Sequence, residues 1–369
     1  ANALCPDGSP RPVKRKSASP SSPVHEYAGE FLGYPARFKV TATTGHIYSL
    51  DFSKEANDWE KTVPSALFHA DTVHCYDGGA RIPDLIRAEA AGADALVLWL
   101  DCDREGENIC FEVLNLAVPH MTGNYSFPNA YQDFIFRAHF SSLSIVDLRR
   151  AMDTLGHPDI NQAHSVDARQ EIDLRLGCAF TRLQTQYFRM HFGKQLGKIT
   201  VSYGPCQFPT LWFCVKRHCD IQAFVPAPFW RLGLAADVDG VEVLFGSAGG
   251  EIWDAERARG MERDLEGGDR VAAVVSTRRW RSVMKRPLPL NTVSMLKMAS
   301  DELGIGPGDA MAMAERLYLK GILSYPRTET NVYPDNFDIR GTAQTIAADS
   351  APWAAEVRAM LAGGMVRAR

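Results

Sequence analysis

"DALVLWLDCDREGENI", residues 94–109, is the stretch that decides the expected fold of the first part of the chain. Residues 95–100 form a continuous apolar run, which is typical of a strand buried on both faces of a parallel sheet. Carboxylates follow at once. Since residues two apart on an extended chain point the same way, Asp101 and Asp103 are expected to converge at the carboxyl end of this strand, where α/β sheets carry their sites.

The carboxylates after the apolar run suggest a metal site. Acidic side chains packed this closely repel one another unless a cation joins them, and hard oxygen donors suit Mg²⁺, which completes its shell with water and substrate phosphate. A structural alternative stays open, in which Glu105 and Glu107 merely favour the start of the next helix. The full Asp-x-Asp-x-Glu-x-Glu pattern after a buried strand favours the metal.

Strand-like and helix-like segments alternate around this motif. "ARFKVTATTGHI" (36–47) alternates like a strand, whereas "RIPDLIRAEAAG" (81–92) and "ENICFEVLNLA" (107–117) have helical periodicity. Such alternation predicts an α/β fold with a parallel sheet. The remaining pattern predicts helix over 160–195, strand and turn over 198–215, antiparallel strands over 224–280 with a turn at "VDG", and helices again from 291.

The totals are those of a globular protein with apolar cores and two to four domains. Of 369 residues, 46% are hydrophobic and 23% charged, the net charge is −4, and no stretch approaches the length of a membrane span. The eight cysteines lack Cys-x-x-Cys spacing, which argues against a zinc site in this chain and for thiols of a reducing compartment. The first residue is Ala, and we expect a fragment of a longer protein.

"GILSYPRTET", residues 321–330, contains a second candidate for a reactive residue. The residues before it repeat at helical spacing, and Tyr318 is expected in the core. Pro326 restricts Tyr325 to an extended conformation, which places Arg327 on the same side of the chain. A phenol with a pKa of about 10 is a weak nucleophile, but a nearby guanidinium favours the phenolate and can clamp a phosphate. Tyr325 is therefore either a half-buried structural aromatic or a nucleophile.

Five blocks of the sequence resemble the type IA DNA topoisomerases. "DCDREGE" is similar to the acidic motif of the TOPRIM domain, "GILSYPRTETNVYP" is similar to the active-site motif, and "RTET" points to the topoisomerase III branch. "KITVSYGPCQFPTLWF" is similar to the eukaryotic form of that branch. "VDARQEIDLRLGCAFTR" and "PLNTVSMLKMASDELG" resemble further segments of the family. The blocks follow the family order over about residues 24–369. The resemblance implies an α/β TOPRIM domain followed by mixed α and β domains of a toroidal core.

The same resemblance divides the chain into expected domains. They are a disordered or looped segment (1–23), a TOPRIM domain incomplete at its N-terminus (24–150), a helical single-strand-DNA groove domain (151–217), a β-rich arch (218–285) and a truncated nucleophile domain (286–369). The family's first strand, with its Glu and Lys, and its His-Pro-rich segment after the tyrosine have no match here. We therefore expect the isolated chain to relax DNA poorly or not at all.

The resemblance implies that Tyr325 attacks a backbone phosphate of single-stranded DNA. It would form a 5′-phosphotyrosyl link and release a 3′-hydroxyl, with Arg327 stabilising the phenolate and the phosphate. Asp101, Asp103 and Glu105 would hold Mg²⁺ near the 3′ end. Resealing after strand passage would relax negatively supercoiled DNA and decatenate or dissolve junctions without ATP, and neither "GKQLGKI" nor "GIGPG" matches a nucleotide-binding loop.

Residues expected to face the DNA are carried over from the same motifs. Arg169, Asp173 and Gln207 would lie along the strand near the cleavage site, and His46, after Gly45, would lie near the metal, although a structural role for His46 stays equally open. Residues 161–219 contain eight Lys or Arg against three acidic residues, with aromatics interleaved, which suits a single strand. A core role explains any one of these aromatics equally well.

Partners and rival functions follow from the same comparison. A helicase partner and a nuclear location are implied, with a mitochondrial one open, and neither a membrane nor a nucleotide cofactor is expected. "VKRK" (13–16) is either a nuclear signal or solvated charge. Two other functions stay open: a TOPRIM nuclease or primase in which metal alone performs the phosphoryl chemistry, and a single-strand-binding chain without chemistry. The intact acidic cluster together with Tyr-x-Arg favours the topoisomerase.

Overall fold

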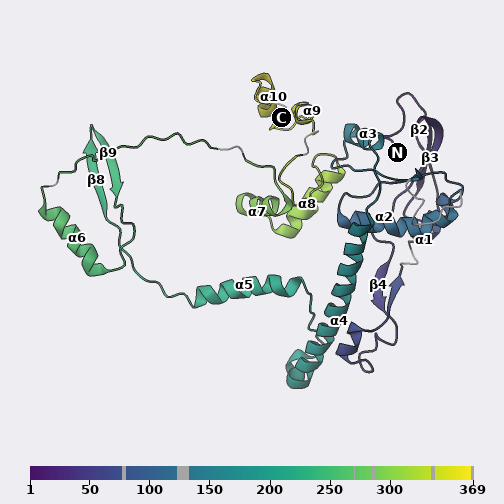
Figure 1. The fold of residues 1–369 in the computed structure, drawn as a ribbon, viewed down its shortest axis with the longest axis horizontal. Coiled ribbons are helices and arrows are strands. Elements are labelled where there is room, and N and C mark those ends of the chain that lie inside the picture. Colours follow the sequence, from purple (N-terminus) through teal and green to yellow (C-terminus); the bar gives the residue numbers. More distant parts are fainter. Residues whose placement is uncertain (77–79, 123–132, 270, 285–286, 334–336, 367–369) are drawn as a thin grey trace. The chain divides into compact units, whose positions relative to one another are not determined.

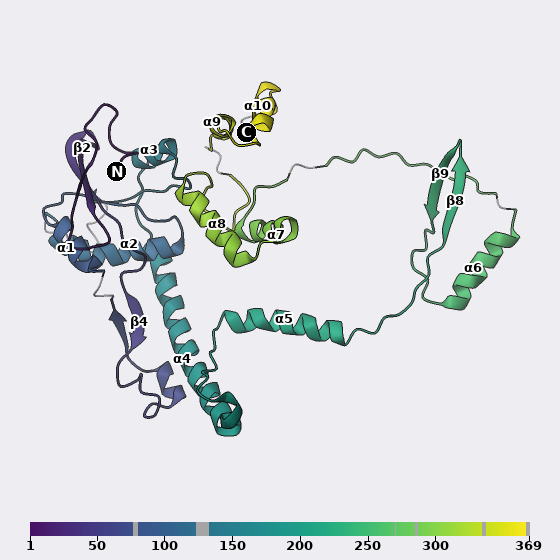
Figure 2. The same cartoon turned by 180° about the vertical axis from the view of Figure 1, so that it is seen from behind.

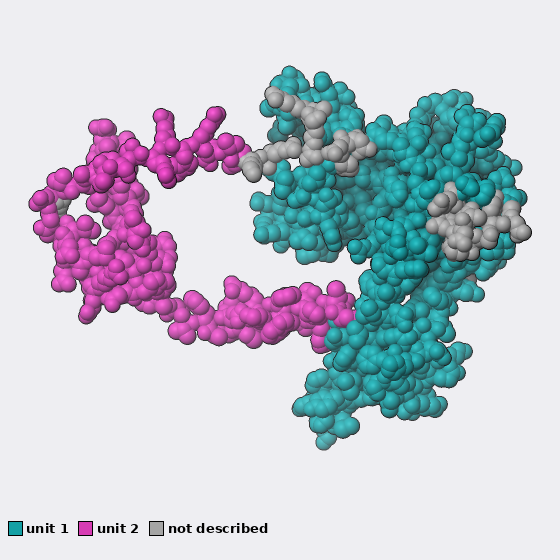
Figure 3. All heavy atoms as spheres, viewed as in Figure 1, with its two compact units in different colours: residues 1–204, 287–369 teal, residues 205–286 magenta. Residues whose placement is uncertain are grey.

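The structure, a computed structural model, describes all residues except 77–79, 123–132, 270, 285–286, 334–336 and 367–369. It divides into two units, which Figure 3 colours separately: unit 1 comprises residues 1–204 and 287–369, and unit 2 comprises residues 205–286. The expected domain boundary at 285–286 lies outside the described residues, and the other expected boundaries stay predictions. Each unit is described by itself below.

The first half of unit 1 contains the predicted alternation of strands and helices (Figure 1). In chain order its elements are β1 (Val13–Arg15), β2 (Val24–Phe31), β3 (Tyr34–Val40), β4 (Ser49–Phe52), η1 (Pro64–Phe68), β5 (Thr72–Cys75), α1 (Ile82–Ala90), β6 (Leu96–Leu98), α2 (Arg104–Ala117), η2 (Val118–His120), β7 (Ile135–Arg137), α3 (Ile145–Asp153) and α4 (Ile160–Leu196).

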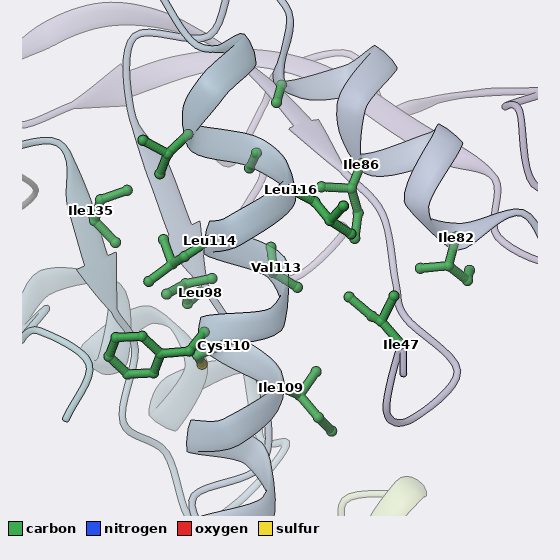
Figure 4. Close-up of a cluster of buried hydrophobic side chains, with 14 of the residues drawn as sticks. Ile47, Ile82, Ile86, Leu98, Ile109, Cys110, Val113, Leu114, Leu116 and Ile135 are labelled. Carbon is green, nitrogen blue, oxygen red and sulfur yellow. The ribbon is translucent and has the colours of Figure 1, made fainter. Parts of the chain in front are cut away.

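The core of unit 1 is built around β6 and α2. Strand β6 pairs in parallel with β7, with Leu96 opposite Ile135 and Leu98 opposite Arg137. Figure 4 shows the apolar side chains of α2, among them Leu114, gathered with Leu98, Ile135 and the inner face of α1. The strand is confirmed over Leu96–Leu98, where Leu98 is buried but Leu96 and Val97 are only partly buried. The acidic residues follow its carboxyl end, as predicted.

The parallel sheet is smaller than the sequence predicts. Among the described strands, only β6 and β7 pair in parallel, whereas β1–β2–β3 and β4–β5 are antiparallel. Strands β2 and β3 fold back on each other through a two-residue turn at Leu32 and Gly33, which both have positive φ. Such turns match the twist of a hairpin and keep neighbouring strands antiparallel.

The expectation of a disordered or looped segment at residues 1–23 is wrong at Val13–Arg15. These residues form β1 and pair with β2 along the edge of the sheet. The guanidinium of Arg15 donates to Glu26 and, at 2.8 Å through Nη1, to Glu89. Two carboxylates thus neutralise a basic side chain that the sequence suggests is solvated, and they attach the segment to β2 and α1.

Helix α4 carries a small lobe made of β4, β5 and η1. Phe52 and Leu67 pack against Ala179 of the helix, and Figure 2, which shows unit 1 from behind, has β4 beside α4 as in Figure 1. Arg182 is 2% exposed and donates to the carbonyl of Ala56 at 2.7 Å. The 37-residue helix confirms the predicted helical stretch. No described helix has both the length and the apolar character that a membrane crossing needs.

Unit 2 consists of α5 (Gln207–Gln222), β8 (Gly233–Val238), β9 (Val241–Gly246) and α6 (Ala255–Gly267). The predicted turn at "VDG" is confirmed, since Asp239 and Gly240, both with positive φ, connect β8 to β9. Strand and turn are wrong for residues 207–215, which are helical. Pro209 does not prevent this, because the first turn of a helix tolerates a residue without an N–H group. Residues 271–280, at the end of the stretch predicted as antiparallel strands, have no regular secondary structure, so that part of the prediction is wrong.

The chain returns to unit 1 with α7 (Thr292–Leu303) and α8 (Pro307–Leu319), followed by α9 (Ile339–Ala347) and α10 (Ala354–Ala362). The helices expected from residue 291 are therefore confirmed. Gly306 rather than a polar side chain caps α8, with Pro307 at its first position. Gly321 follows the helix with a φ of 73° and turns the chain into the stretch that carries Tyr325.

A buried ion pair holds the turn between β6 and α2 that carries Asp101 and Asp103, called the acidic turn from here on. Arg137 is 0% and Glu107 4% exposed, and Nε of Arg137 donates to Oε1 of Glu107 at 2.7 Å. The same guanidinium donates to the carbonyls of Leu100 and Asp101, both at 2.7 Å. The second oxygen of Glu107 accepts from the backbone N–H of Asp159, next to the start of α4. One ion pair thus connects β7, the acidic turn, α2 and α4.

The acidic turn also lies unusually close to α2. A Cβ added to Gly106 would lie 2.0 Å from the carbonyl oxygen of Asp101. No side chain fits in that space, so glycine at this position is what allows the turn to fold back onto the helix. The same close packing directs the carbonyl of Asp101 toward the interior, where Arg137 binds it.

Replacing Arg137 with Met is expected to destabilise unit 1 by about 3–5 kcal/mol, because Glu107 would remain buried without a cation. The measurement is urea denaturation followed by circular dichroism. Arg37→Met is the matched control, because Arg37 is an exposed partner of Glu26, and its denaturation midpoint should stay close to that of the unchanged protein. An Arg137→Met protein as stable as this control would contradict the structural role of the pair.

Candidate active site

The four acidic residues after β6 have different partners: Asp101 and Asp103 bind tyrosines, Glu105 binds exposed basic side chains, and Glu107 binds the buried Arg137. Asp103 caps α2, since its Oδ1 accepts from the backbone N–H of Gly106 at 2.8 Å. Glu107 belongs to the buried pair with Arg137. Asp101 and Asp103 turn their remaining oxygens toward two tyrosines, whereas Glu105 is bound by basic side chains. Helix capping and electrostatic roles therefore coexist in one motif.

Tyr325 lies directly against the acidic turn. Its hydroxyl donates to Oδ2 of Asp103 at 2.5 Å, so that one carboxylate caps α2 with one oxygen and receives the phenol with the other. The backbone N–H of Tyr325 donates to the carbonyl of Ser141 at 2.8 Å, which anchors the stretch to the segment after β7. Residues 324–325 have no regular secondary structure, as the sequence predicts. The two motifs that the sequence singles out thus meet.

A second tyrosine completes this arrangement. Tyr318 on α8 is 6% exposed, which agrees with its expected place in the core. Its hydroxyl nevertheless donates to Oδ1 of Asp101 at 3.3 Å, and its ring meets that of Tyr325 edge to face, with centroids 5.3 Å apart. Sequence reasoning missed this contact. The available signal was that a buried tyrosine needs a partner for its polar tip.

Tyr325 has a protonated phenol whose acidic neighbours are Asp103 and Asp101. Burial and the hydrogen bond to Asp103 raise the pKa of Tyr325 well above its usual value, while the nearby Arg327 guanidinium opposes the shift. Burial, and then the charge of Asp103, also raise the pKa of Asp101. A proton leaving the phenol therefore has Asp103 as an acceptor within hydrogen-bond distance.

Arg327 is bound by a residue that the sequence analysis does not identify. Its Nε donates to Oε1 of Glu315 on α8 at 3.1 Å, and Nη2 donates to the same oxygen. This hydrogen bond to Glu315 is the main cause that raises the pKa of Arg327. The side chain of Arg327 remains 58% exposed. The Arg327 guanidinium thus lies near the Tyr325 phenol, bound to Glu315 and accessible to solvent.

His46 and Arg169 both reach Glu105. Nε2 of His46 lies 2.9 Å from Oε2 of Glu105, and Nη2 of Arg169 lies 2.6 Å from Oε1. Glu112, missed in the sequence, contacts Nδ1 of His46 at 3.0 Å and accepts from the backbone N–H of Ile47. The contact with Glu112, and then that with Glu105, raise the pKa of His46, while its partial burial opposes them. Glu105 is therefore already engaged by basic groups.

The three carboxylates predicted to bind metal are not gathered at one point. Among the described residues, no three His, Cys, Asp or Glu side chains lie close enough together to hold a metal ion. Asp101 and Asp103 are the two carboxylates that would hold a divalent cation, since each has an oxygen that faces the tyrosines and binds only a phenol hydroxyl. Mg²⁺ commonly uses one or two carboxylates and keeps water and phosphate as its other ligands.

The other residues predicted to contact DNA lie on different elements and differ in exposure. Asp173 is exposed on α4, one turn after Arg169, whose side chain is 54% exposed. Gln207 begins α5 in unit 2, and its relation to the site stays a prediction. Arg182 and Arg175 are poor candidates for phosphate binding, because they bind backbone carbonyls of the β4–η1 lobe. All four aromatics of α4 are exposed, namely Phe180, Tyr187, Phe188 and Phe192.

Comparison with known proteins agrees with this geometry. The family model described as "DNA topoisomerase" matches residues 157–367, and the one described as "Toprim domain" matches residues 25–143. Human DNA topoisomerase 3-beta-1 is 44% identical over 94% of this chain, and the fruit-fly DNA topoisomerase 3-beta is 45% identical over 92%. The chain spans 40% and 38% of the length of these two proteins, respectively.

A solved structure has a related fold. The full-length topoisomerase I from Thermotoga maritima aligns with 80% of this chain and 46% of its own length, with a TM-score of 0.53 and 21% identity. At that identity the likeness concerns the fold alone, and it confirms the expected combination of an α/β TOPRIM domain with mixed α and β domains. With the motifs, the meeting of Tyr325 and the acidic turn, and the family matches together, the chain belongs to the type IA DNA topoisomerase family.

Proposed function

We propose that this chain carries the DNA-cleaving centre of a type IA topoisomerase, in which Tyr325 is the nucleophile. The observation that carries the proposal is the 2.5 Å hydrogen bond from the Tyr325 hydroxyl to Asp103. It joins a tyrosine and a carboxylate 222 positions apart in the chain. Each residue also has a separate anchor, since Asp103 caps α2 through its other oxygen and the backbone N–H of Tyr325 donates to Ser141.

In the proposed reaction, the Tyr325 oxygen attacks a phosphorus of single-stranded DNA. A bond forms between that oxygen and phosphorus, the bond from phosphorus to the 3′ oxygen breaks, and the phosphate stays on the 5′ side as a phosphotyrosine. The phenol proton passes to Asp103, and the leaving 3′ oxygen takes a proton from a solvent water to become a hydroxyl. Asp103 then gives its proton to the resulting hydroxide and is a carboxylate again. Arg327 stabilises the charge that develops on the phosphoryl oxygens.

Resealing is the same exchange in reverse. The 3′-hydroxyl attacks the phosphotyrosine, and the bond from phosphorus to the Tyr325 oxygen breaks. One phosphoester replaces another in each direction, and no ATP is needed. Asp101 and Asp103 would hold Mg²⁺, with Glu105 joining them only if it leaves His46 and Arg169, and the ion would supply positive charge for the 3′ oxygen and the phosphate.

The rest of the proposed activity concerns the whole protein. Single-stranded DNA is the proposed partner, with Arg169, Asp173 and Gln207 along the strand and His46 near the metal. Passage of a second strand would relax negatively supercoiled DNA and resolve linked molecules. The similar proteins from human and fruit fly are eukaryotic, which supports a nuclear location. A helicase partner rests on the family resemblance alone and stays a prediction.

Replacing Tyr325 with Phe is expected to abolish the covalent attachment of DNA and leave single-strand binding nearly unchanged, because only the attacking oxygen is removed. Denaturing electrophoresis of the full-length protein with a labelled single-stranded oligonucleotide measures the attachment. Tyr34→Phe, at an exposed tyrosine of β3, is the matched control and should form the adduct normally. Cleavage that persists in Tyr325→Phe would favour a metal-only TOPRIM nuclease.

Replacing Arg327 with Ala should slow adduct formation by about 100-fold, because one charged donor to the phosphoryl oxygens is lost. The measurement is the single-turnover rate of adduct formation with saturating oligonucleotide. Arg340→Ala, at an exposed arginine of α9, is the control for removing a surface charge. An unchanged rate in Arg327→Ala would remove this residue from the proposed reaction.

Asp101→Asn combined with Asp103→Asn should weaken Mg²⁺ binding by about tenfold or more, since both anionic ligands are lost. Asparagine is chosen because it also caps helices and should leave α2 in place. Calorimetric titration with Mg²⁺ measures the affinity, and Asp239→Asn, in the turn of unit 2, is the control. Equal affinities in the double variant and the control would place the metal elsewhere.

A further inference from the structure

A threonine of α7 holds the loop that carries the nucleophile. The hydroxyl of Thr292 donates to the carbonyl of Pro326 at 2.7 Å and lies 3.0 Å from that of Thr328. The same oxygen accepts from the backbone N–H of Thr328 at 2.8 Å. In addition, the backbone N–H of Thr292 donates to the carbonyl of Thr328 at 3.0 Å. Thr292 thus makes four contacts with the loop, all of them to Pro326 and Thr328.

These contacts bracket Arg327. The carbonyl of Pro326 belongs to the peptide plane before Arg327, and the N–H of Thr328 belongs to the plane after it. Because peptide groups are planar, fixing both planes fixes the two backbone dihedrals of Arg327 and the direction in which its side chain leaves the chain. Thr292 therefore sets the direction in which the Arg327 side chain leaves the backbone, although it does not contact the guanidinium.

The hydroxyl of Thr292 is not needed by its own helix. Asn291 caps α7, since its side chain accepts from the backbone N–H of Ser294 at 2.8 Å. A threonine hydroxyl offers one donor and two acceptor positions, and the loop uses both functions. Tyr325 itself has a separate anchor in the carbonyl of Ser141. Losing the Thr292 hydroxyl should thus release Arg327 and leave α7 and Tyr325 in place.

We propose that Thr292 is a positioning residue for DNA cleavage, which acts by holding the backbone on both sides of Arg327. This inference rests on the proposed function, because Arg327 matters only if a phosphate is attacked beside it. Glu315 holds the far end of the same side chain. Thr292 and Glu315 together keep the guanidinium beside the phenol before DNA arrives, which lowers the entropy lost in the transition state.

The test uses the full-length protein and a labelled single-stranded oligonucleotide. Thr292→Val keeps the shape of the side chain and removes the hydroxyl, whereas Thr292→Ser keeps the hydroxyl. We expect Thr292→Val to slow single-turnover adduct formation by about tenfold, since hydrogen bonds worth about 1 kcal/mol or more are lost. Thr292→Ser should restore most of the rate, and oligonucleotide affinity should stay constant in both variants. Thr345→Val, at an exposed threonine of α9, controls for the exchange itself.

A double-mutant cycle distinguishes positioning from general support. If Thr292 acts through Arg327, adding Thr292→Val to Arg327→Ala should slow the reaction no further. A full rate in Thr292→Val, or losses that multiply in the double variant, would overturn the inference. If the valine variant does not fold, as judged by circular dichroism, Thr292→Ala provides the same comparison.

Failure of this inference can be told apart from failure of the proposed function. Tyr325→Phe serves as the reference in the same experiment. If Tyr325→Phe abolishes the adduct while Thr292→Val reacts at the full rate, only the positioning role is wrong. If Tyr325→Phe still forms the adduct, the nucleophile has been misassigned and the proposed function itself fails.

Discussion

The buried guanidinium of Arg137 is the constraint on which the rest of the site depends. It is fully enclosed, paired with Glu107, and bound to the two carbonyls that precede and begin the acidic turn. Without it, the turn would have buried carbonyls lacking donors, and Asp101 and Asp103 would have no fixed direction. The close approach of Gly106 to Asp101 acts on the same turn from the side of α2. The carboxylates proposed to act in cleavage are thus positioned by an ion pair that is buried behind the turn.

The loop that carries Tyr325 and Arg327 lies against this turn and is also held by several contacts. Its backbone N–H groups donate to the carbonyl of Ser141 and to the hydroxyl of Thr292, and Tyr318 packs its ring against that of Tyr325. The phenol and its cation are thereby brought to the acidic turn without any helix or strand running through the reacting residues. In this arrangement the phenol is protonated, and Asp103 accepts its hydrogen bond. Tyr325 and Asp103, which we propose as nucleophile and proton acceptor, are therefore neighbours before a phosphate enters.

Much of this could be predicted from the sequence because the decisive signals are local. The apolar run at 95–100, the helical period of 160–195 and the proline after Tyr325 each constrain their own neighbourhood. The contacts that assemble the site are not local. Nothing in the sequence connects Arg137 with Glu107, or Thr292 with Thr328, because their pairing depends on how the elements pack. Likewise, the basic side chains of Arg15 and Arg182 look solvated in sequence but are neutralised or buried by distant partners.

In the proposed reaction, the oxygen of Tyr325 becomes bonded to a DNA phosphate. Mass spectrometry of the trapped adduct, after digestion with nuclease and protease, locates that bond. We expect a nucleotide attached through its 5′ phosphate to the peptide that contains Tyr325, with the mass increase on that tyrosine. A nucleotide on any other residue, including the neighbouring Tyr318, or one attached through its 3′ phosphate, would be incompatible with this reaction.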